Sequence, residues 1–217
     1  MISVVVTENP MPLEQKMGCI IPMTIRFLHG ELRINAYPSF EPIAEKMQKM
    51  ADSRKMDAGE LIDFFADEMS QKMREYGYSY DADASSAPYD LYEADQKHLP
   101  DEKMVTSDTW KLDGDEVAFG ISRNGEIVSC ASANAPLEED EEDVISIEVE
   151  TEDAWQKKGF AASCAAALIR YLMRTGSYRA VQYECSEANI ASERVAQKLG
   201  LTLVERRCYF VGYLEEE

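Results

Sequence analysis

The stretch of sequence that decides the fold is Trp155-Gln156-Lys157-Lys158-Gly159-Phe160-Ala161, which joins a strand pattern to a helix pattern. Val144–Thr151, just before it, alternates an apolar face with a carboxylate-bearing face and therefore predicts a strand. In residues 162–174, just after it, small and apolar side chains recur at helical spacing, and Gly176 suits the helix end. The order strand, turn, helix predicts an α/β fold for this half of the chain.

The turn itself has the features of an anion site. A glycine-bearing turn in front of a helix exposes backbone N–H groups at the positive end of the helix dipole, an arrangement that suits a pyrophosphate. Lys157 and Lys158 add positive charge at the same place. The residues alone leave the bound nucleotide open.

A second pattern follows further along the chain. A predicted strand, Arg179–Cys185, leads into Asn189–Leu201. Within that segment one helical face is small and apolar, and Gly200 suits the helix end.

Both patterns carry a family resemblance. Gln156-x-x-Gly159-x-Ala161 resembles the Q/R-x-x-G-x-G/A signature of the GNAT superfamily of acyl-CoA N-acyltransferases, and Asn189–Leu201 is similar to that family's second coenzyme A-contacting block. The resemblance implies an α/β fold with a mixed central sheet of about six to seven strands and flanking helices. It also implies acetyl-CoA as cosubstrate. The donor-binding residues that it implies are Val149, Thr151, Gln156, Lys157, Lys158, Gly159, Phe160, Ala161, Ala162, Asn189 and Ser192.

Acyl transfer to an amine needs a neutral amine, a stabilised oxyanion and a proton for the departing thiolate. Glu148 and Glu150 are the candidate bases, because they share a strand face beside the expected thioester, where burial would raise the carboxylate pKa. The alternative is that both are solvated or ion-paired carboxylates. Many family members have a tyrosine four residues before the glycine that ends the second block, and Ala196 stands there in this chain. Tyr209 is the candidate acid, or else a tyrosine that packs at an edge.

The remaining segments suggest two domains. Tyr80–Pro88 is small, acidic and proline-bearing, as a linker or long loop would be, and we place the boundary between residues 1–85 and 86–217. The first region is predicted to be a mainly helical α/β region, with a strand and two amphipathic helices. These three elements are expected at Leu32–Ala36, Glu41–Ala51 and Asp57–Tyr76.

A hairpin is expected at the start of the second region. The Asn124-Gly125 pair lies between two β-rich runs, Val117–Ile121 and Glu126–Ala133, and is a strong turn signal. The acidic run Glu138–Asp143 that follows is expected to be a solvated loop.

Composition narrows the classes of partner. The formal net charge of −19 disfavours nucleic-acid binding. The acidic surface either attracts a cationic acceptor or only keeps the protein soluble. Five scattered cysteines and two histidines give no metal-binding spacing, so no metal is expected and the thiols are expected to be reduced. No apolar run reaches the length of a membrane span or signal sequence, so we expect a cytoplasmic protein that does not engage a membrane.

The leading hypothesis is an N-acetyltransferase that acts on a primary amine of a small molecule or peptide. Residues 1–85 would then shape the acceptor site or form a homodimer interface. A second hypothesis is a catalytically silent acyl-CoA-binding regulatory module. A third is an acidic interaction protein that binds a basic partner in an acceptor-like cleft. Coenzyme A binding separates the third from the others, and turnover separates the first two.

Overall fold

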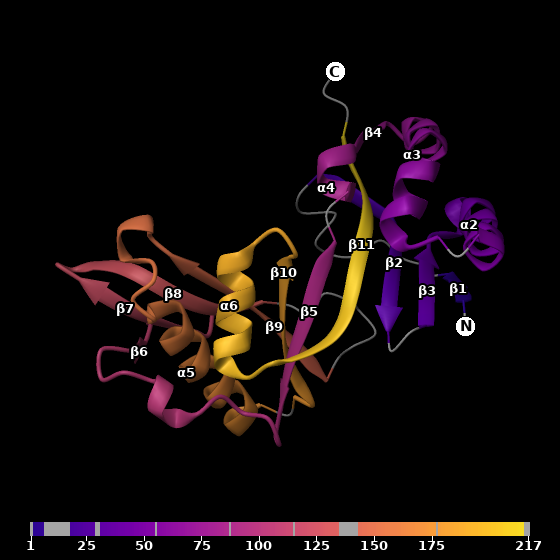
Figure 1. The fold of residues 1–217 in the computed structure, drawn as a ribbon. Coiled ribbons are helices and arrows are strands. Elements are labelled where there is room, and N and C mark those ends of the chain that lie inside the picture. Colours follow the sequence, from indigo (N-terminus) through magenta and orange to yellow (C-terminus); the bar gives the residue numbers. More distant parts are fainter. Residues whose placement is uncertain are drawn as a thin grey trace. The chain divides into compact units, whose positions relative to one another are not determined.

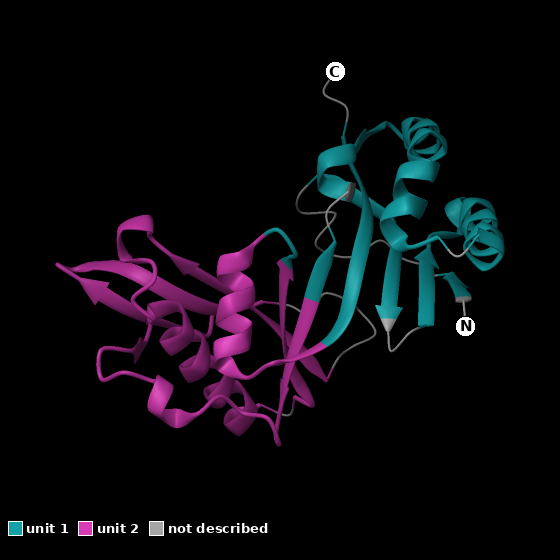
Figure 2. Cartoon of the chain, in the orientation of Figure 1, with its two compact units in different colours: residues 1–90, 186–188, 204–217 teal, residues 91–185, 189–203 magenta. Residues whose placement is uncertain are grey.

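We describe the protein from a computed structural model, which covers residues 2–6, 18–28, 31–54, 56–86, 88–114, 116–134, 143–176 and 178–214. Eleven strands are assigned in these residues, more than the six to seven predicted, and the mixed α/β class is confirmed. The chain forms two compact units (Figure 2). Unit 1 comprises Met1–Asp90, Ser186–Ala188 and Val204–Glu217, and unit 2 comprises Leu91–Cys185 and Asn189–Leu203.

Unit 1 is a sheet with helices packed against it (Figure 1). The strand order is β1-β3-β2-β11, and β4 also pairs with β11. The β1–β3 pair is parallel, and the β2–β3, β2–β11 and β4–β11 pairs are antiparallel. The elements are β1 (Ile2–Val6), β2 (Cys19–Leu28), β3 (Glu31–Ala36), the 3-10 helix η1 (Pro38–Phe40), α2 (Glu41–Arg54), α3 (Ala58–Arg74), β4 (Tyr78–Asp81), α4 (Ala82–Ser86) and β11 (Thr202–Leu214).

The amphipathic patterns of unit 1 fold as helices because their apolar faces reach the core. Met47 and Met69 are fully buried there, together with Phe210 of β11. The start of α3 is a capping box: the Asp57 side chain accepts from the Glu60 N–H, and the Glu60 side chain accepts from the Asp57 N–H. Both predicted helices and the strand at residues 32–36 are thus confirmed, with small shifts at their ends.

The expected linker at Tyr80–Pro88 is wrong in its described part, which contains the end of β4 and helix α4. Local hydrogen bonds explain the helix. The Asp81 carboxylate accepts from the Ala84 N–H at 2.9 Å, and the Ser85 hydroxyl donates to the Asp81 carbonyl. Ser85 in turn accepts from the Val211 N–H at 2.9 Å, so this short acidic helix is fixed to β11 within unit 1.

Unit 2 is a mixed sheet in the order β5-β10-β9-β8-β7-β6, where β9 and β10 are parallel and the pairs from β9 to β6 are antiparallel. Helix α5 packs on β7, β8 and β9, and α6 lies beside α5 (Figure 1). The elements are β5 (Tyr89–Asp95), η2 (Glu102–Met104), β6 (Trp110–Lys111), β7 (Ala118–Arg123), β8 (Glu126–Asn134), β9 (Val144–Thr151), η3 (Asp153–Trp155), α5 (Phe160–Thr175), β10 (Ala180–Ser186) and α6 (Ile190–Leu199).

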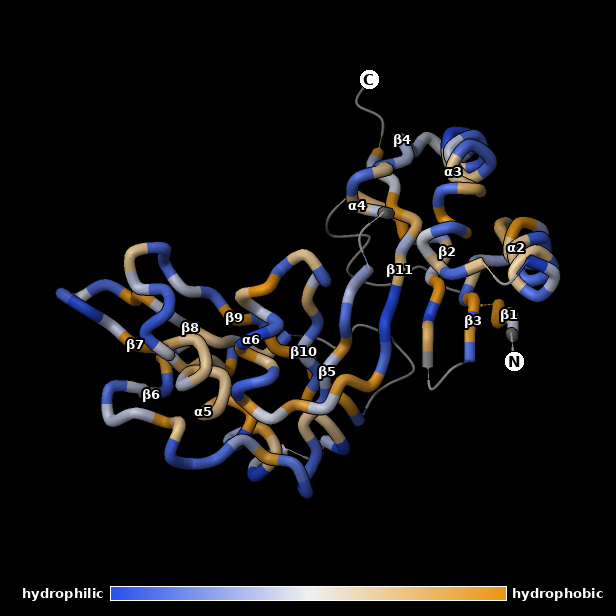
Figure 3. The backbone as a smooth tube through the Cα atoms, viewed as in Figure 1, coloured by the Kyte–Doolittle hydropathy of each residue, from blue (hydrophilic) through white to orange (hydrophobic). Residues whose placement is uncertain are grey.

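The local predictions for unit 2 are confirmed. Asn124 and Gly125 both have positive φ, 55° and 88°, as a two-residue hairpin turn between β7 and β8 requires. The predicted strand Val144–Thr151 is β9, residue for residue. Helix α5 is mostly apolar along its length (Figure 3), and its small residues are buried against the sheet. The acidic run Glu138–Asp143 lies outside the described residues except for Asp143.

The cysteines in the described part of the chain form no disulfide. All five cysteines there are free, and four are buried. Burial raises the pKa of Cys164 and of Cys208 to about 11, so these thiols keep their protons at neutral pH. Within the described ranges no group of three or more His, Cys, Asp or Glu is arranged to hold a metal ion. No described helix is long and apolar enough to cross a membrane.

Candidate donor-binding site

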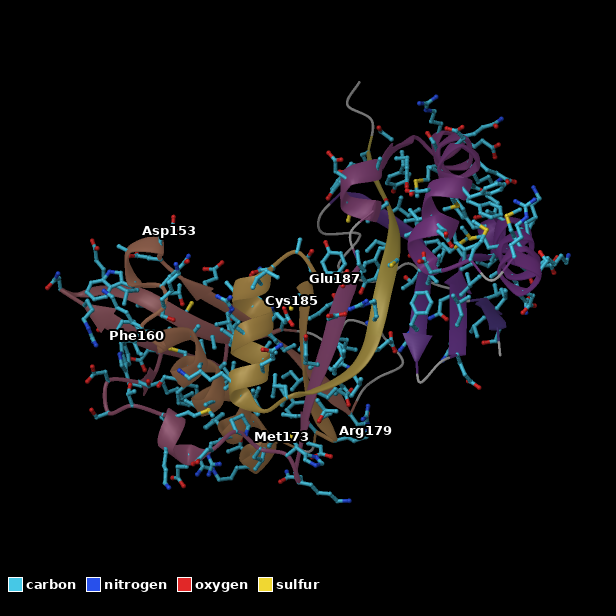
Figure 4. All side chains as sticks on the ribbon, viewed as in Figure 1. Asp153, Phe160, Met173, Arg179, Cys185 and Glu187 are labelled. Atoms are coloured by element: carbon cyan, nitrogen blue, oxygen red, sulfur yellow. The ribbon has the colours of Figure 1, made fainter. Side chains whose placement is uncertain are left out.

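The turn between β9 and α5 is held in a left-handed conformation. Lys157 and Gly159 have φ of 61° and 83°, and Gly159 is the N-cap of α5 without any side-chain cap. The N–H groups of the first helical turn therefore point out of the helix unpaired. The turn runs between Asp153 and Phe160, which Figure 4 labels. Because a left-handed N-cap without a side chain leaves room for a ligand, this turn has the geometry of an anion-binding cradle.

A pocket of about 410 Å³ lies between this turn and α6, inside unit 2. Ten of the eleven donor-binding residues implied by the sequence line it, and Lys158 does not. The Lys158 ammonium instead lies 4.0 Å from the centre of the Trp155 ring. The lining residues are Val149, Thr151, Trp155, Gln156, Lys157, Gly159, Phe160, Ala161, Ala162, Tyr183, Asn189, Ala191, Ser192, Arg194, Val195 and Lys198.

Positive charge gathers around the cradle, although the chain as a whole carries −19. Lys157 comes from the turn, while Arg194 and Lys198 come from α6. A Cβ built on Gly159 would lie only 3.1 Å from the Lys198 Nζ, so this ammonium sits directly over the turn. The sequence reading missed both α6 cations. The signal was the spacing Ala191, Arg194, Val195, Lys198, which repeats every three or four residues and so marks one helical face.

The floor of the pocket is a gap between two parallel strands. The ladder of β9 with β10 stops after the pair Ser146 and Gln182, while β9 stays paired with β8 as far as Thr151. The strands β9 and β10 therefore separate beyond this pair.

The direction of the β9 N–H groups follows from one hydrogen bond. The Glu152 N–H donates to the Val128 carbonyl of β8 at 3.0 Å. Since N–H direction alternates along a strand, the N–H groups of Val149 and Thr151 point the other way, into the gap. The alternation therefore selects Val149 and Thr151 as the backbone donors that face the gap.

Asn189 and Ser192 organise the start of α6. The Asn189 side chain accepts from the Ser192 N–H at 3.1 Å and so caps the helix. The Ser192 hydroxyl hydrogen-bonds the phenol of Tyr183, a pocket residue that the sequence reading also missed. These contacts fix the polar groups at the α6 end of the pocket.

The predicted catalytic residues lie elsewhere. Glu148 and Glu150 are exposed and share the face of β9 opposite to Val149 and Thr151, in register with Ser132 and Cys130 of β8. The burial expected for the two carboxylates is therefore not present. Glu148 accepts from the Asn134 side chain at 3.2 Å.

Glu150 lines a second hollow of about 540 Å³ within unit 2, and Thr151 lines both this hollow and the donor pocket. The strand end at Glu150 and Thr151 thus separates two cavities. The other residues of the second hollow are Ile127, Val128, Ser129, Cys130 and Glu152.

Tyr209 belongs to unit 1 and does not line the pocket. Its ring packs against Tyr89 with the centroids 5.3 Å apart, an edge-on contact. Ala196, where many relatives of the resembled family have a tyrosine, is fully buried on α6.

Part of the chain matches a known protein family. A family model for GNAT acetyltransferases matches residues 114–209, a range that contains every residue lining the pocket. No curated protein sequence matches the chain.

Solved structures with similarity to the chain were also found. One is a putative GNAT-family acetyltransferase from Novosphingobium aromaticivorans DSM 12444, with 12% identity over 60% of this chain and 66% of that chain and a TM-score of 0.49. Another is a GNAT-family acetyltransferase from Colwellia psychrerythraea, with 9% identity over 82% of this chain and 75% of that chain and a TM-score of 0.49. A GCN5-related N-acetyltransferase from Sphaerobacter thermophilus matches with 10% identity over 83% and 71% of the two chains and a TM-score of 0.47.

Proposed function

We propose, starting from a chain whose residues 114–209 form a GNAT acetyltransferase domain, that it transfers an acetyl group from acetyl-CoA to a primary amine. The observation that carries the proposal is the cation-lined pocket over the left-handed turn at Gly159. Bound acetyl-CoA would supply the acetyl group as a thioester.

The residues of the pocket divide into two ends. At one end, the backbone N–H groups from Lys158 to Ala162 would hold a pyrophosphate, with Lys198 above them. At the other end, the Val149 and Thr151 N–H groups are directed at the place where a carbonyl oxygen would develop negative charge. Because these groups are fixed by the sheet and the helix, they need no rearrangement to act.

The second hollow supports a place for the acceptor. An amine that enters beside Glu150 would lie on the opposite side of the strand end from the donor pocket, since Thr151 lines both. Glu150 and Glu152 would attract a cationic amine into the hollow, and Glu150 would remove a proton from it before attack. We therefore propose a cationic small-molecule or peptide amine as the acceptor. We also propose that the enzyme is cytoplasmic.

The test of the function is a panel of primary amines incubated with acetyl-CoA, with released thiol as the readout. Polyamines and basic peptides are expected to give turnover, and acidic or neutral amines less. Binding of acetyl-CoA without turnover on any amine would favour the second candidate, a silent acyl-CoA-binding module. Two observations favour this silent module. Ala196 stands on α6 where many family members have a tyrosine, and Tyr209 lies outside the pocket.

Replacement of the proposed base tests the acceptor side. Glu150→Gln is expected to lower kcat/KM about 100-fold at neutral pH, because the amide cannot take a proton, while the affinity for acetyl-CoA stays the same. Glu126→Gln, at the exposed start of β8, is the matched control. A loss confined to Glu148→Gln would assign the role to Glu148 instead, and full activity in both variants would exclude both.

The position of the Lys198 ammonium over the turn predicts that this residue contributes to acetyl-CoA affinity. Lys198→Met should weaken acetyl-CoA binding about tenfold, because a charge-assisted contact to phosphate is lost. The salt dependence of the affinity should also become shallower. Calorimetry at two salt concentrations measures both, with Lys103→Met, an exposed lysine outside the pocket, as control. An affinity equal to that of the wild type would show that Lys198 does not meet the phosphates.

A further inference from the structure

Tyr183 stands at the point where the gap between β9 and β10 begins. Gln182 is the last β10 residue paired with β9, so Tyr183 is the first residue beyond the ladder. Its side chain is 4% exposed and lines the donor pocket together with Val149 and Thr151 of the opposite strand. A phenol therefore lies beside the two backbone donors that face the gap.

The hydroxyl is held in place from α6. Its hydrogen bond with Ser192 ties the ring to the first turn of that helix. One turn further on, at the same helical face as Ser192, the buried residue is the small Ala196. Ala196 and Tyr183 belong to the same buried core of unit 2.

The other polar side chains of the pocket have different places or partners. Gln156 donates to Asp153 at 2.8 Å, and Asn189 caps α6. Of the three cations, Lys157 lies on the turn, while Arg194 and Lys198 lie on one face of α6. The Lys198 ammonium lies close to Gly159 of the turn. Of the described residues that line the pocket, Tyr183 contributes the one phenol, and it lies at the strand gap.

We propose that the Tyr183 hydroxyl donates a hydrogen bond to the thioester sulfur of the acyl donor and stabilises the thiolate that leaves. This inference rests on the proposed function. In the step, the amine nitrogen forms the C–N bond and the C–S bond breaks, and the electron pair of that bond stays on sulfur. The amine gives its proton to the base. The thiolate is protonated by solvent water, and Tyr183 keeps its own proton throughout.

The environment of Tyr183 favours this role over proton transfer. Burial raises the pKa of Tyr183, and the hydrogen bond with Ser192 only partly opposes this rise. Because its pKa is raised, its phenolate would be a stronger base than the leaving thiolate. A neutral phenol that keeps its proton is a good hydrogen-bond donor to a charged sulfur.

The experiment compares the binding of coenzyme A and desulfo-coenzyme A by calorimetry over a series of alkaline pH values, so that the thiolate form of coenzyme A becomes populated. The wild type is expected to bind coenzyme A about tenfold more tightly, because a hydrogen bond to a charged group is worth that much. In Tyr183→Phe the two affinities should become nearly equal. The variant should also lose about tenfold in kcat at unchanged KM for acetyl-CoA.

Two further variants complete the test. Tyr92→Phe removes a hydroxyl from a tyrosine that is 5% exposed in the same core but outside the pocket, and it should keep the wild-type preference. Tyr209→Phe tests the other candidate tyrosine. An unchanged preference and kcat in Tyr183→Phe, or a loss only in Tyr209→Phe, would overturn the inference. A wild-type protein that binds coenzyme A with no preference over the desulfo analogue would overturn it even if Tyr183→Phe failed to fold. Failure of the wild type to bind either ligand would instead contradict the proposed function.

Discussion

Gly159→Asp is expected to weaken acetyl-CoA binding about 100-fold or more, because a carboxylate in the cradle repels a pyrophosphate and neutralises the ammonium above it. The position of Lys198 makes the effect specific. A Cβ at residue 159 would lie 3.1 Å from its Nζ, so an aspartate would pair with the cation that the phosphates need.

Gly159→Asn separates charge from backbone strain. Both substitutions place a side chain at a φ of 83°, and asparagine and aspartate tolerate this left-handed region better than most residues. Asparagine has nearly the same size as aspartate but no charge. We expect the affinity of Gly159→Asn for acetyl-CoA to fall less than about tenfold. The free energy of unfolding should fall by a similar small amount in both variants, about 1 kcal/mol. Equal affinities of the two variants would show that the nucleotide phosphates do not bind at this turn.

Glu205→Gln is expected to lower the free energy of unfolding of unit 1 by about 3 to 5 kcal/mol, because it removes the charge of a buried carboxylate that pairs with two buried guanidinium groups. Glu205 of β11 receives two hydrogen bonds from Arg26 of β2, at 2.6 and 2.7 Å, and one from Arg207 at 2.5 Å. The side chain of Glu205 is 3% exposed, so water does not replace these partners. Chemical denaturation measures the loss. Glu45→Gln, which removes an exposed i,i+4 pair with Lys49, is the control and should change little.

The contribution of Glu205 to the free energy of unfolding depends on pH. Burial alone would raise the pKa of Glu205, but the hydrogen bonds of Arg26 and the charges of Arg207 and Arg26 outweigh it and hold the pKa below its usual value. A lowered folded-state pKa stabilises the protein above the unfolded value of about 4.3, and this contribution is lost as the pH falls through the folded value. The difference between wild type and Glu205→Gln should therefore be largest at neutral pH and shrink below about pH 4. A difference that stayed constant with pH would show that Glu205 is not ionised in the folded chain.

The elements that the sequence predicted correctly are those with local signals. The alternation in Val144–Thr151, the Asn124-Gly125 turn and the helical spacing after Gly159 each specify a structure within a few residues. The cradle was predictable for the same reason, since a glycine turn, a strand and a helix start are adjacent in the chain.

The features that escaped prediction depend on long-range contacts. Arg26 and Glu205 are 179 residues apart, and no periodicity marks them as partners. The role of Tyr183 depends on where the β9–β10 ladder ends, which is a property of the folded sheet. Lys198 was in principle readable from the α6 face, but only the folded turn shows that this face covers Gly159.

The most direct test of the account is a calorimetric titration of the wild-type chain with acetyl-CoA. We expect saturable binding of one acetyl-CoA per chain, together with a rise in melting temperature, since a ligand that binds the native state stabilises it. We also expect that this heat disappears in Gly159→Asp at the same ligand concentrations. The absence of both heat and a thermal shift in the wild type at millimolar acetyl-CoA would contradict the assignment of this pocket to the acyl donor.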